Sequence, residues 1–203
     1  MKKELQEAFG NIDIYLFDQL LKGRFDECQT VLDLGCGNGR NLVYFLKNNF
    51  QVFAIDQQPD SIREVKLLAS QIAPQVPPDN FLVAPIEDMP FENNRFDVVL
   101  SSAVFHFARN ESHFDAMLMA AWRVLKPGGF LFARLASDIG IEDKVIPLGN
   151  RRYRLPDGSD RFLVNEQILL DYTKSLNGEL YEEIKTTIVR NQRCMTTWCV
   201  RKN

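Results

Sequence analysis

The residue types and spacings most suited to chemistry lie in one short stretch, residues 31–41, which reads Val-Leu-Asp-Leu-Gly-Cys-Gly-Asn-Gly-Arg-Asn. Gly35, Gly37 and Gly39 leave the backbone without side chains at the point where an apolar strand is expected to turn into a helix. A ligand can lie against such a backbone at the start of a helix. The stretch therefore predicts a nucleotide cradle.

The glycine spacing distinguishes two kinds of cradle. Dinucleotide-binding folds use G-x-G-x-x-G, whereas this chain has G-x-G-x-G with Asp33 two residues before the first glycine. Because turns also use glycine for backbone reasons alone, the rest of the chain has to decide between a binding site and a simple turn.

A second acid follows the next predicted strand, which covers residues 51–55 and ends at Asp56. Asp56 lies 17 positions after Gly39 (56 minus 39), close to the spacing of a strand-turn-helix-strand unit. An acid at the carboxyl end of such a strand can accept hydrogen bonds from ribose hydroxyls. The alternative role is a helix cap, which Asp60 or Ser61 could also provide.

Three segments in order resemble the class I S-adenosylmethionine-dependent methyltransferases. The pattern D-x-G-x-G-x-G resembles their motif I. Residues 86–100, with a P-F pair and then F-D-V-V, resemble the adenine-binding loop and fourth strand, and W-R-V-L-K-P-G-G-F-L resembles the turn before the fifth strand. The continuation G-N-G-R-N resembles the tellurite-resistance branch. The resemblance runs from about residue 31 to residue 135.

The resemblance implies S-adenosyl-L-methionine as the cofactor. In the family the motif I acid lies near the methionine amino group, and the glycines admit the methionine and the ribose. The implied cofactor-binding residues are Asp33, Gly35, Cys36, Gly37, Gly39, Arg40, Asn41, Asp56, Gln57, Ile86, Glu87 and Ser101. Pro85 stands where the family commonly has an acid for the adenine amino group, so Glu87 or Asp88 would have to make that contact.

The elements that would position these residues form an α/β fold. The resemblance implies a Rossmann-like three-layer sandwich with a seven-stranded, mostly parallel sheet. Two β-rich stretches, residues 181–189 and 194–200, are separated by four residues and predict a closing antiparallel hairpin. We expect a single domain over residues 1–203, with an N-terminal helical cap at about 1–25 and an insertion at about 137–165.

The insertion is too long for an ordinary connection, so it is the segment expected to choose the methyl acceptor. Its turn signals predict a small β-hairpin. It carries five basic residues, Lys144, Arg151, Arg152, Arg154 and Arg161. Guanidinium groups suit a carboxylate, phosphate or oxyanion, although a solvated loop would also carry such charges.

Methyl transfer from a sulfonium needs placement of the acceptor more than it needs chemistry from the protein. If the acceptor has to lose a proton, His106 is the predicted catalytic base, because it follows the fourth strand where the family's acceptors lie. The alternative is a wall residue between Phe105 and Phe107. His113 is expected at the start of the following helix.

The composition limits the partners. The net charge is −3 among 203 residues and the pI is near 5.5, so neither nucleic acid nor an anionic membrane is an expected partner. The four cysteines form no C-x-x-C pair, and no metal site is expected. Without a signal-like or membrane-spanning apolar run, the protein is expected to be cytoplasmic. The sequence does not indicate its oligomeric state.

These observations predict an S-adenosylmethionine-dependent methyltransferase with a small-molecule acceptor, for which the arginines favour an anion. A D-P-P-Y-like sequence after the fourth strand and a Pro-Cys nucleophile are both absent, which disfavours amino and cytosine-C5 acceptors. One alternative is a non-catalytic protein that keeps the fold and binds the cofactor or a partner. A nicotinamide-dependent oxidoreductase is disfavoured by the glycine spacing.

Overall fold

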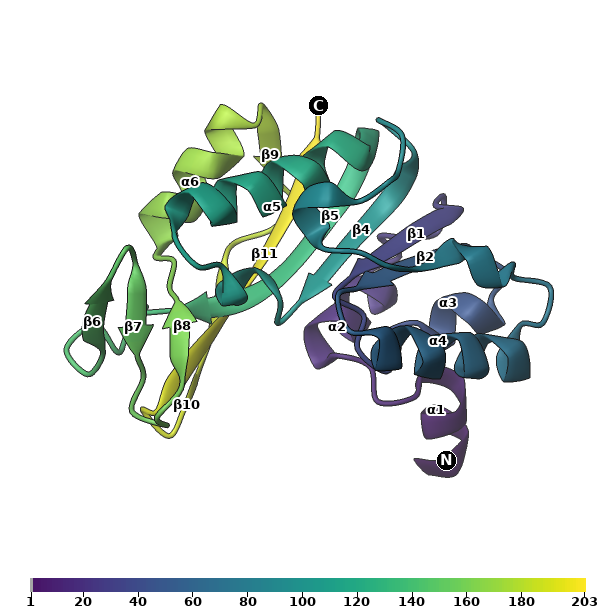
Figure 1. Cartoon of the computed structure of the whole chain (residues 1–203), viewed down its shortest axis with the longest axis horizontal. Helices are drawn as coiled ribbons and strands as arrows, with labels where there is room; N and C mark the ends of the chain where they lie inside the picture. The colour runs from purple at the N-terminus through teal and green to yellow at the C-terminus, as the bar shows by residue number, and fades with distance from the viewer. Residues whose placement is uncertain (1) are drawn as a thin grey trace.

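A mostly parallel sheet forms the middle layer of the computed structural model, which describes residues 2–203 (Figure 1). Its strands follow the order β10-β11-β5-β4-β1-β2-β3. Only β11 runs antiparallel to its neighbours β5 and β10, so the predicted sheet with its closing hairpin is confirmed. The strands are β1 (Thr30–Leu34), β2 (Gln51–Asp56), β3 (Phe81–Val83), β4 (Phe96–Ser102), β5 (Leu125–Ser137), β10 (Lys185–Val189) and β11 (Arg193–Lys202). A short additional strand, β9 (Gly178–Leu180), pairs with β11.

The central strands are nearly continuous apolar runs because both of their faces are covered, as is usual in parallel sheets. Val31 pairs with Val52 of β2 on one side and with Val98 of β4 on the other, and all three are buried. Since these strands are parallel, their carboxyl ends lie at one edge of the sheet. The glycine turn after β1 and Asp56 after β2 are thereby brought together.

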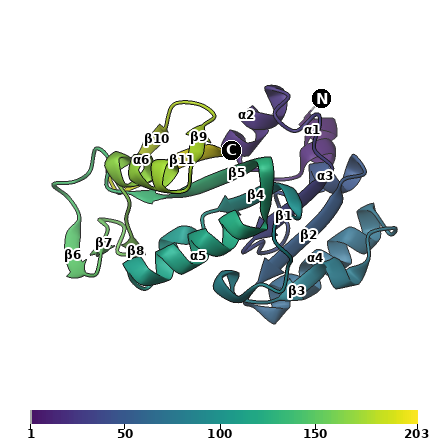
Figure 2. The same cartoon turned by 90° about the horizontal axis from the view of Figure 1, so that it is seen from above.

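Helices cover both faces of the sheet. Buried side chains of α2, α3 and α4 pack on one face and those of α5 and α6 on the other. Figure 2 shows α5 and the pair α2 and α3 on opposite sides of the strands. The helices are α1 (Lys2–Phe9), α2 (Ile14–Leu21), α3 (Val43–Lys47), α4 (Pro59–Ile72), α5 (Glu111–Val124) and α6 (Glu166–Ser175), with short 3-10 turns η1 (Pro78–Asn80), η2 (Ile86–Asp88) and η3 (Phe105–Phe107). Among residues 2–203, no helix is long and apolar enough to cross a membrane.

The K-P-G-G segment at residues 126–129 differs from the expected free turn before a strand. Leu125 already pairs with Phe96, so the segment lies inside β5, where the pairing with β4 shifts register. Gly128 adopts a φ of +77°, and a Cβ at Gly129 would lie 3.0 Å from the Asp97 carbonyl oxygen. The glycines therefore permit a bulge within the strand.

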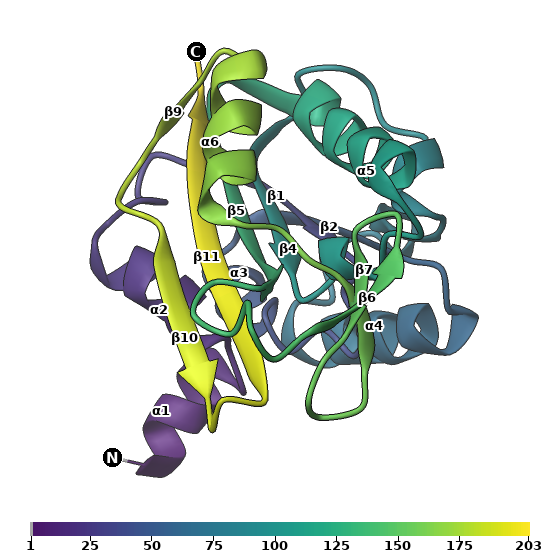
Figure 3. The same ribbon diagram turned by 90° about the vertical axis from the view of Figure 1, so that its left-hand side faces the viewer.

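The insertion forms a three-stranded antiparallel sheet, one strand more than the predicted hairpin. Its strands are β6 (Ile146–Gly149), β7 (Arg152–Arg154) and β8 (Asp160–Phe162). A bridge between Ser137 and Val164 returns the chain to the end of β5. Figure 3 shows this small sheet and the N-terminal helices on opposite sides of β11. The carboxyl edge of the main sheet lies between the two.

Candidate active site

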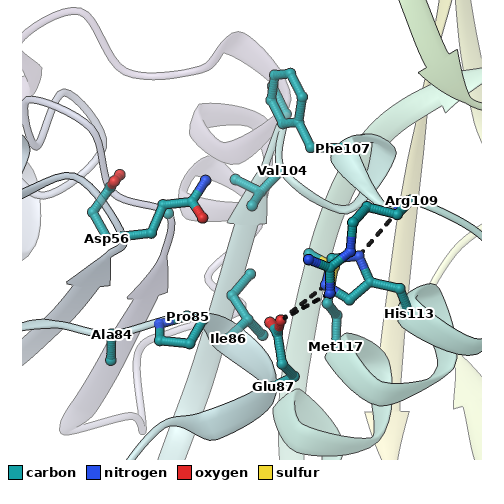
Figure 4. A pocket seen from close by; sticks show the side chains of 13 residues that line it. Asp56, Ala84, Pro85, Ile86, Glu87, Val104, Phe107, Arg109, His113 and Met117 are labelled. Atoms are coloured by element: carbon teal, nitrogen blue, oxygen red, sulfur yellow. Dashed lines mark hydrogen bonds and ion pairs between the residues drawn. The ribbon is translucent and has the colours of Figure 1, made fainter.

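A cavity of about 430 Å³ opens at the carboxyl edge of the sheet (Figure 4). Four strand ends supply its walls: Gly35 after β1, Asp56 at the end of β2 with Gln57 after it, residues 84–87 after β3, and Val104 after β4. His113 and Met117 of α5 close one side. We call this space the donor cavity. Ligands of open α/β sheets bind at such an edge, where the strand order reverses.

The glycine turn brings bare backbone to the donor cavity. Gly35 has a φ of +63°, and a Cβ there would lie 2.7 Å from a methyl carbon of Val104. Gly37 has a φ of +53°, and a Cβ there would meet nothing within 4 Å. Both positions use the left-handed conformation that glycine adopts freely. The turn thus needs glycine at Gly35 for space and leaves room for a ligand beside Gly37.

Asp56 joins this turn to β2. Its Oδ2 accepts a 2.9 Å hydrogen bond from the Gly37 N–H, and its Oδ1 accepts a 2.8 Å bond from the Gln58 N–H. Each carboxylate oxygen can accept a further bond. Asp56 can therefore hold the turn and still accept bonds from a hydroxyl-bearing ligand in the donor cavity.

Glu87 lies on the opposite wall and is held in place by its neighbours. His113 Nε2 is 3.0 Å from Glu87 Oε1, and an Arg109 guanidinium nitrogen is 3.9 Å from the same oxygen (Figure 4). Burial alone would raise the pKa of Glu87, but hydrogen bonds from its backbone amide and from His113 lower it. The donor cavity therefore has a carboxylate at each side, Asp56 and Glu87.

Asp33 lies beneath the turn with only 2% of its surface exposed. Its Oδ2 has no hydrogen-bond partner among residues 2–203. Burial raises the pKa of this carboxyl to about 7, although nearby Arg40 acts to lower it. A buried carboxylate oxygen without a partner is costly unless a cation or donor reaches it. This oxygen therefore fits the amino group of a bound ligand.

We expect the stability of the Asp33→Asn variant, relative to the unchanged protein, to increase as the pH rises from about 4 to about 7. The pKa of Asp33 is raised from 3.8 to about 7 on folding, so the folded state binds the extra proton between these values. Stability is consequently lost as the pH rises through this window, and asparagine removes that loss. Thermal unfolding across the pH range measures the difference. A constant difference would contradict the assignment, and Asp79→Asn, at the exposed η1 turn, controls for loss of a charge.

Several predicted cofactor residues are placed away from the donor cavity. A Cβ at Gly39 would meet Leu68 and Val65 of α4 at 3.0 and 3.1 Å, so this glycine allows close helix packing. Ser101 and Cys36 are buried, within β4 and in the turn itself respectively. Asn41 is also buried, and its Oδ1 accepts a 3.0 Å bond from the Asp13 N–H. These side chains support the cradle rather than line it.

Arg40 also points elsewhere. Its guanidinium lies 3.3 Å from the Ser102 hydroxyl and 3.6 Å from Asp13 Oδ2. By contrast, Gly35, Asp56, Gln57, Ile86 and Glu87 all line the donor cavity. Of the predicted residues outside the cavity, Arg40 and Asn41 fasten the turn to Asp13 of the N-terminal cap, while Gly39 packs against α4 and Ser101 is buried in β4.

A second cavity of about 330 Å³ adjoins the first. Ala103 and Phe107, which follow β4, line both. The far walls come from β5, from β8 and the turn before it, and from β10 and β11, so one side belongs to the insertion. We call this space the acceptor cavity. Its other lining residues are His106, Arg134, Ala136, Leu155, Asp157, Ser159, Arg161, Val189, Arg193, Cys194 and Met195.

Three guanidinium groups line the acceptor cavity. Arg134 comes from β5, Arg161 from β8 and Arg193 from β11, against one carboxylate, Asp157. The Arg161 guanidinium lies 4.9 Å from the centre of the Phe107 ring, over the wall shared with the donor cavity. Hydrogen bonds from Ser159, together with the charges of Arg193 and Arg161, lower the pKa of Asp157. Arg134 is itself paired with Asp13 Oδ2 at 3.1 Å, so the excess of positive charge in the cavity comes from Arg161 and Arg193 against Asp157.

His106 does not have the geometry of the predicted general base. It is 5% exposed, and its Nδ1 accepts a 3.1 Å hydrogen bond from the buried Ala136 N–H. Burial, with the charges of Arg161 and Arg134, lowers the pKa of His106 to about 3. An uncharged imidazole whose Nδ1 accepts a bond carries its proton on Nε2. The ring is consequently a donor at neutral pH, which corrects the predicted role.

Some lining residues were absent from the predicted set. Arg134 and Arg193 lie far from each other in sequence, and only the pairing of β5 with β11 brings them together. Of the insertion's predicted basic residues, Arg161 alone lines the cavity, while Arg154 is paired with Asp160 at 2.8 Å. Ala103 has a φ of +65°, a strained conformation for alanine that no sequence signal marks.

A comparison with known families matches residues 32–133 to a methyltransferase domain. The chain is 32% identical over 101 residues to an uncharacterized methyltransferase of Synechocystis sp., covering 50% of this chain and 44% of that protein. It is 35% identical over 178 residues to a tRNA (carboxymethyluridine(34)-5-O)-methyltransferase of Schizosaccharomyces pombe, covering 76% and 71%. The chain spans less than half the length of the Synechocystis relative.

The fold is also shared with solved structures. A 1,6-didemethyltoxoflavin-N1-methyltransferase of Burkholderia thailandensis, solved with 1,6-didemethyltoxoflavin and S-adenosylhomocysteine, superposes with a TM-score of 0.71 at 18% identity, covering 100% of this chain and 82% of that one. The strand order, the glycine turn and the matched domain define a class I methyltransferase. The chain belongs to the class I S-adenosylmethionine-dependent methyltransferase family. The finer resemblance to tellurite-resistance members stays a prediction. Among residues 2–203, no group of histidines, cysteines and acids could hold a metal ion.

Proposed function

We propose that the chain transfers a methyl group from S-adenosylmethionine to an anionic small molecule held in the acceptor cavity. The observation that carries this proposal is the wall shared by the two cavities, where Ala103 and Phe107 line both. A donor on one side and an acceptor on the other would meet there. Methyl transfer by displacement at carbon requires this close, in-line approach.

The donor cavity fits S-adenosylmethionine residue by residue. Gly35 provides bare backbone, and the free oxygen of Asp33 would take the methionine amino group. Asp56 would accept bonds from the ribose hydroxyls, and Pro85 with Glu87 would border the adenine. When bound, the cofactor supplies a methyl group already activated on a sulfonium sulfur. The protein's own part is to hold and orient the donor and the acceptor and to exclude water.

The acceptor cavity supports the anionic part of the proposal. Arg134, Arg161 and Arg193 come from three separate strands; Arg134 is paired with Asp13, and Asp157 alone faces the other two, which leaves an excess of positive charge. The lining also includes the apolar side chains of Leu155, Val189 and Met195. This lining suits a small molecule with an anionic end and an apolar body.

Calorimetric titration with S-adenosylmethionine, S-adenosylhomocysteine and NADH tests the donor site. We expect both sulfur nucleotides to bind and NADH not to bind. Transfer of label from methyl-labelled S-adenosylmethionine to small anions, with bulk tRNA in a parallel reaction, then tests the acceptor. Failure of both sulfur nucleotides to bind would sink the proposal. Label in tRNA but in none of the small anions would favour the activity named for the S. pombe relative.

We expect Asp56→Ala to weaken S-adenosylhomocysteine binding by about tenfold or more, because a charged hydrogen-bond acceptor is lost from the donor cavity. Asp60→Ala is the matched control, since Asp60 is an exposed acid four residues later, paired with Arg63. Calorimetry gives both affinities. Equal affinities in the two variants would show that Asp56 does not contribute to cofactor binding.

A further inference from the structure

The lining of the acceptor cavity indicates that the acceptor binds already ionised, because it offers no strong base that could remove a proton from an alcohol or a thiol at neutral pH. The titratable and charged groups facing His106 come from β5, β8, β11 and the turn before β8. They are Arg134, Arg161, Arg193, Cys194 and Asp157. Arginine stays protonated, and Asp157 is stabilised as a carboxylate. Burial raises the pKa of the Cys194 thiol, whose sulfur lies 3.1 Å from the Ser137 hydroxyl.

His106 itself is fixed in one tautomer by its surroundings. The Ala136 backbone N–H can only donate, so it requires Nδ1 of His106 to be the accepting nitrogen. The proton then resides on Nε2, and within residues 2–203 no protein group takes a hydrogen bond from it. Nε2–H is therefore available to donate to a lone pair of a bound molecule. Arg134 and Arg161 oppose protonation of the ring to the cation.

We infer that the acceptor cavity takes a small carboxylate, that His106 binds it as a fixed Nε2–H donor, and that the methyl group is transferred to a carboxylate oxygen without a protein base. This inference rests on the proposed function. An alcohol, a phenol or a thiol is largely protonated at neutral pH and would need a base, whereas a carboxylic acid is already ionised. An ammonium would be repelled by Arg161 and Arg193, and as a cation it has no lone pair.

The reaction then balances without a proton transfer. A lone pair of the carboxylate oxygen forms the new O–C bond as the S–C bond of the sulfonium breaks, and that electron pair stays on sulfur. A carboxylate and a sulfonium give a methyl ester and a neutral thioether. Guanidinium groups orient the anion before transfer, and the neutral ester no longer pairs with them. The same residues that bind the acceptor thus favour release of the product.

Nitrogen-15 NMR of the two histidines tests the tautomer without any acceptor. The ring-nitrogen shifts distinguish the Nε2–H form, the Nδ1–H form and the cation. We expect His106 to stay in the Nε2–H form from about pH 5 to about pH 8. The signals of His106 are those that disappear in His106→Gln. If that variant does not fold, His106 gives the signals that remain in His113→Gln. A titration of His106 within that range, or an Nδ1–H form, would overturn the inference.

Binding to the protein saturated with S-adenosylhomocysteine tests the acceptor class. The probes are benzoate, octanoate and malonate, each compared with its matching alcohol and amide. We expect at least one carboxylate to bind tenfold or more tightly than its neutral partners, and Arg161→Gln to abolish this preference. Arg154→Gln is the matched control, because Arg154 belongs to the same small sheet but pairs with Asp160. No preference for any carboxylate would overturn the inference.

The chemical stability of the product distinguishes a methyl ester from other methylated products. Label transferred to a probe should be released as methanol by alkali, as only an ester allows, and label that survives alkali would overturn the inference. The amide of His106→Gln can place an N–H near the position of Nε2, so this variant should keep more of the carboxylate affinity than His106→Asn, whose amide is one methylene shorter. Failure of S-adenosylhomocysteine to bind at the outset would instead count against the proposed function, so the two failures are distinguishable.

Discussion

The Gly35→Ala variant is expected to lose S-adenosylhomocysteine affinity by tenfold or more and to unfold at a lower temperature. Alanine at a φ of +63° costs about 1–2 kcal/mol in backbone conformation alone. The added methyl would also lie 2.7 and 2.8 Å from the two methyl carbons of Val104. Val104 is β-branched and stiff, so relief requires movement of the wall of the donor cavity. Calorimetry and thermal unfolding measure the two effects.

Two further variants separate strain from the clash. Gly149→Ala, at a φ of +91° with nothing within 4 Å of the new Cβ, meets only the backbone cost and should leave binding unchanged. Adding Val104→Ala to Gly35→Ala removes both clashing methyl groups and should restore part of the lost affinity. The double-mutant cycle then gives the coupling between the two positions. Additive losses would show that the contact with Val104 does not matter.

The shared wall explains why so small a clash should matter. Val104 is followed by the turn η3, which places His106 and Phe107, and preceded by Ala103, whose N–H donates a 2.7 Å bond to the Arg134 carbonyl. Ala103 adopts a φ of +65° without being glycine. Strain of this kind persists only where the surroundings fix the backbone, and it is common at functional sites. A shift of Val104 would therefore reach both cavities.

The sheet and the cofactor edge could be predicted from the sequence because their signals are local. The apolar runs of β1 and β4, the glycines after β1 and the acid after β2 each lie within a few residues. Parallel pairing then brings the strand ends to one edge whatever the loops do. The two residues of the turn that would face a ligand, Gly35 and Gly37, were predicted for this reason.

The acceptor cavity could not be predicted in the same way. Its three arginines come from three separate strands, and nothing near Arg193 marks it as a partner of Arg134. The tautomer of His106 depends on the Ala136 N–H, 30 residues away. A histidine after the fourth strand predicts a base by its intrinsic pKa, while the observed neighbours make it a donor. Such contacts between distant residues carry no local pattern.

The Asp13→Ala variant should be among the least stable single variants of the chain. Asp13 is the N-cap of α2, and its Oδ1 accepts a 2.9 Å bond from the Tyr15 N–H. Its Oδ2 accepts bonds of 3.1 Å from Arg134 and 3.2 Å from Ser102. It therefore ties the N-terminal cap to the ends of β4 and β5. We expect a loss of about 3 kcal/mol in the free energy of unfolding, because a cap is lost and a largely buried arginine is left unpaired.

A loss of this size should lower the melting temperature by roughly 6–12 °C. Asp18→Ala is the matched control on the same helix, since Asp18 forms partly exposed ion pairs with Lys22 and Lys185 and should cost less than about 1 kcal/mol. Asp13→Asn keeps a cap and loses the charge, so its stability should lie between the two. Equal melting temperatures for Asp13→Ala and Asp18→Ala would show that the cap is held without Asp13. A melting temperature of Asp13→Asn between those of the other two variants would show that both the helix cap and the ion pair with Arg134 contribute. The Arg134 side chain also lines the acceptor cavity.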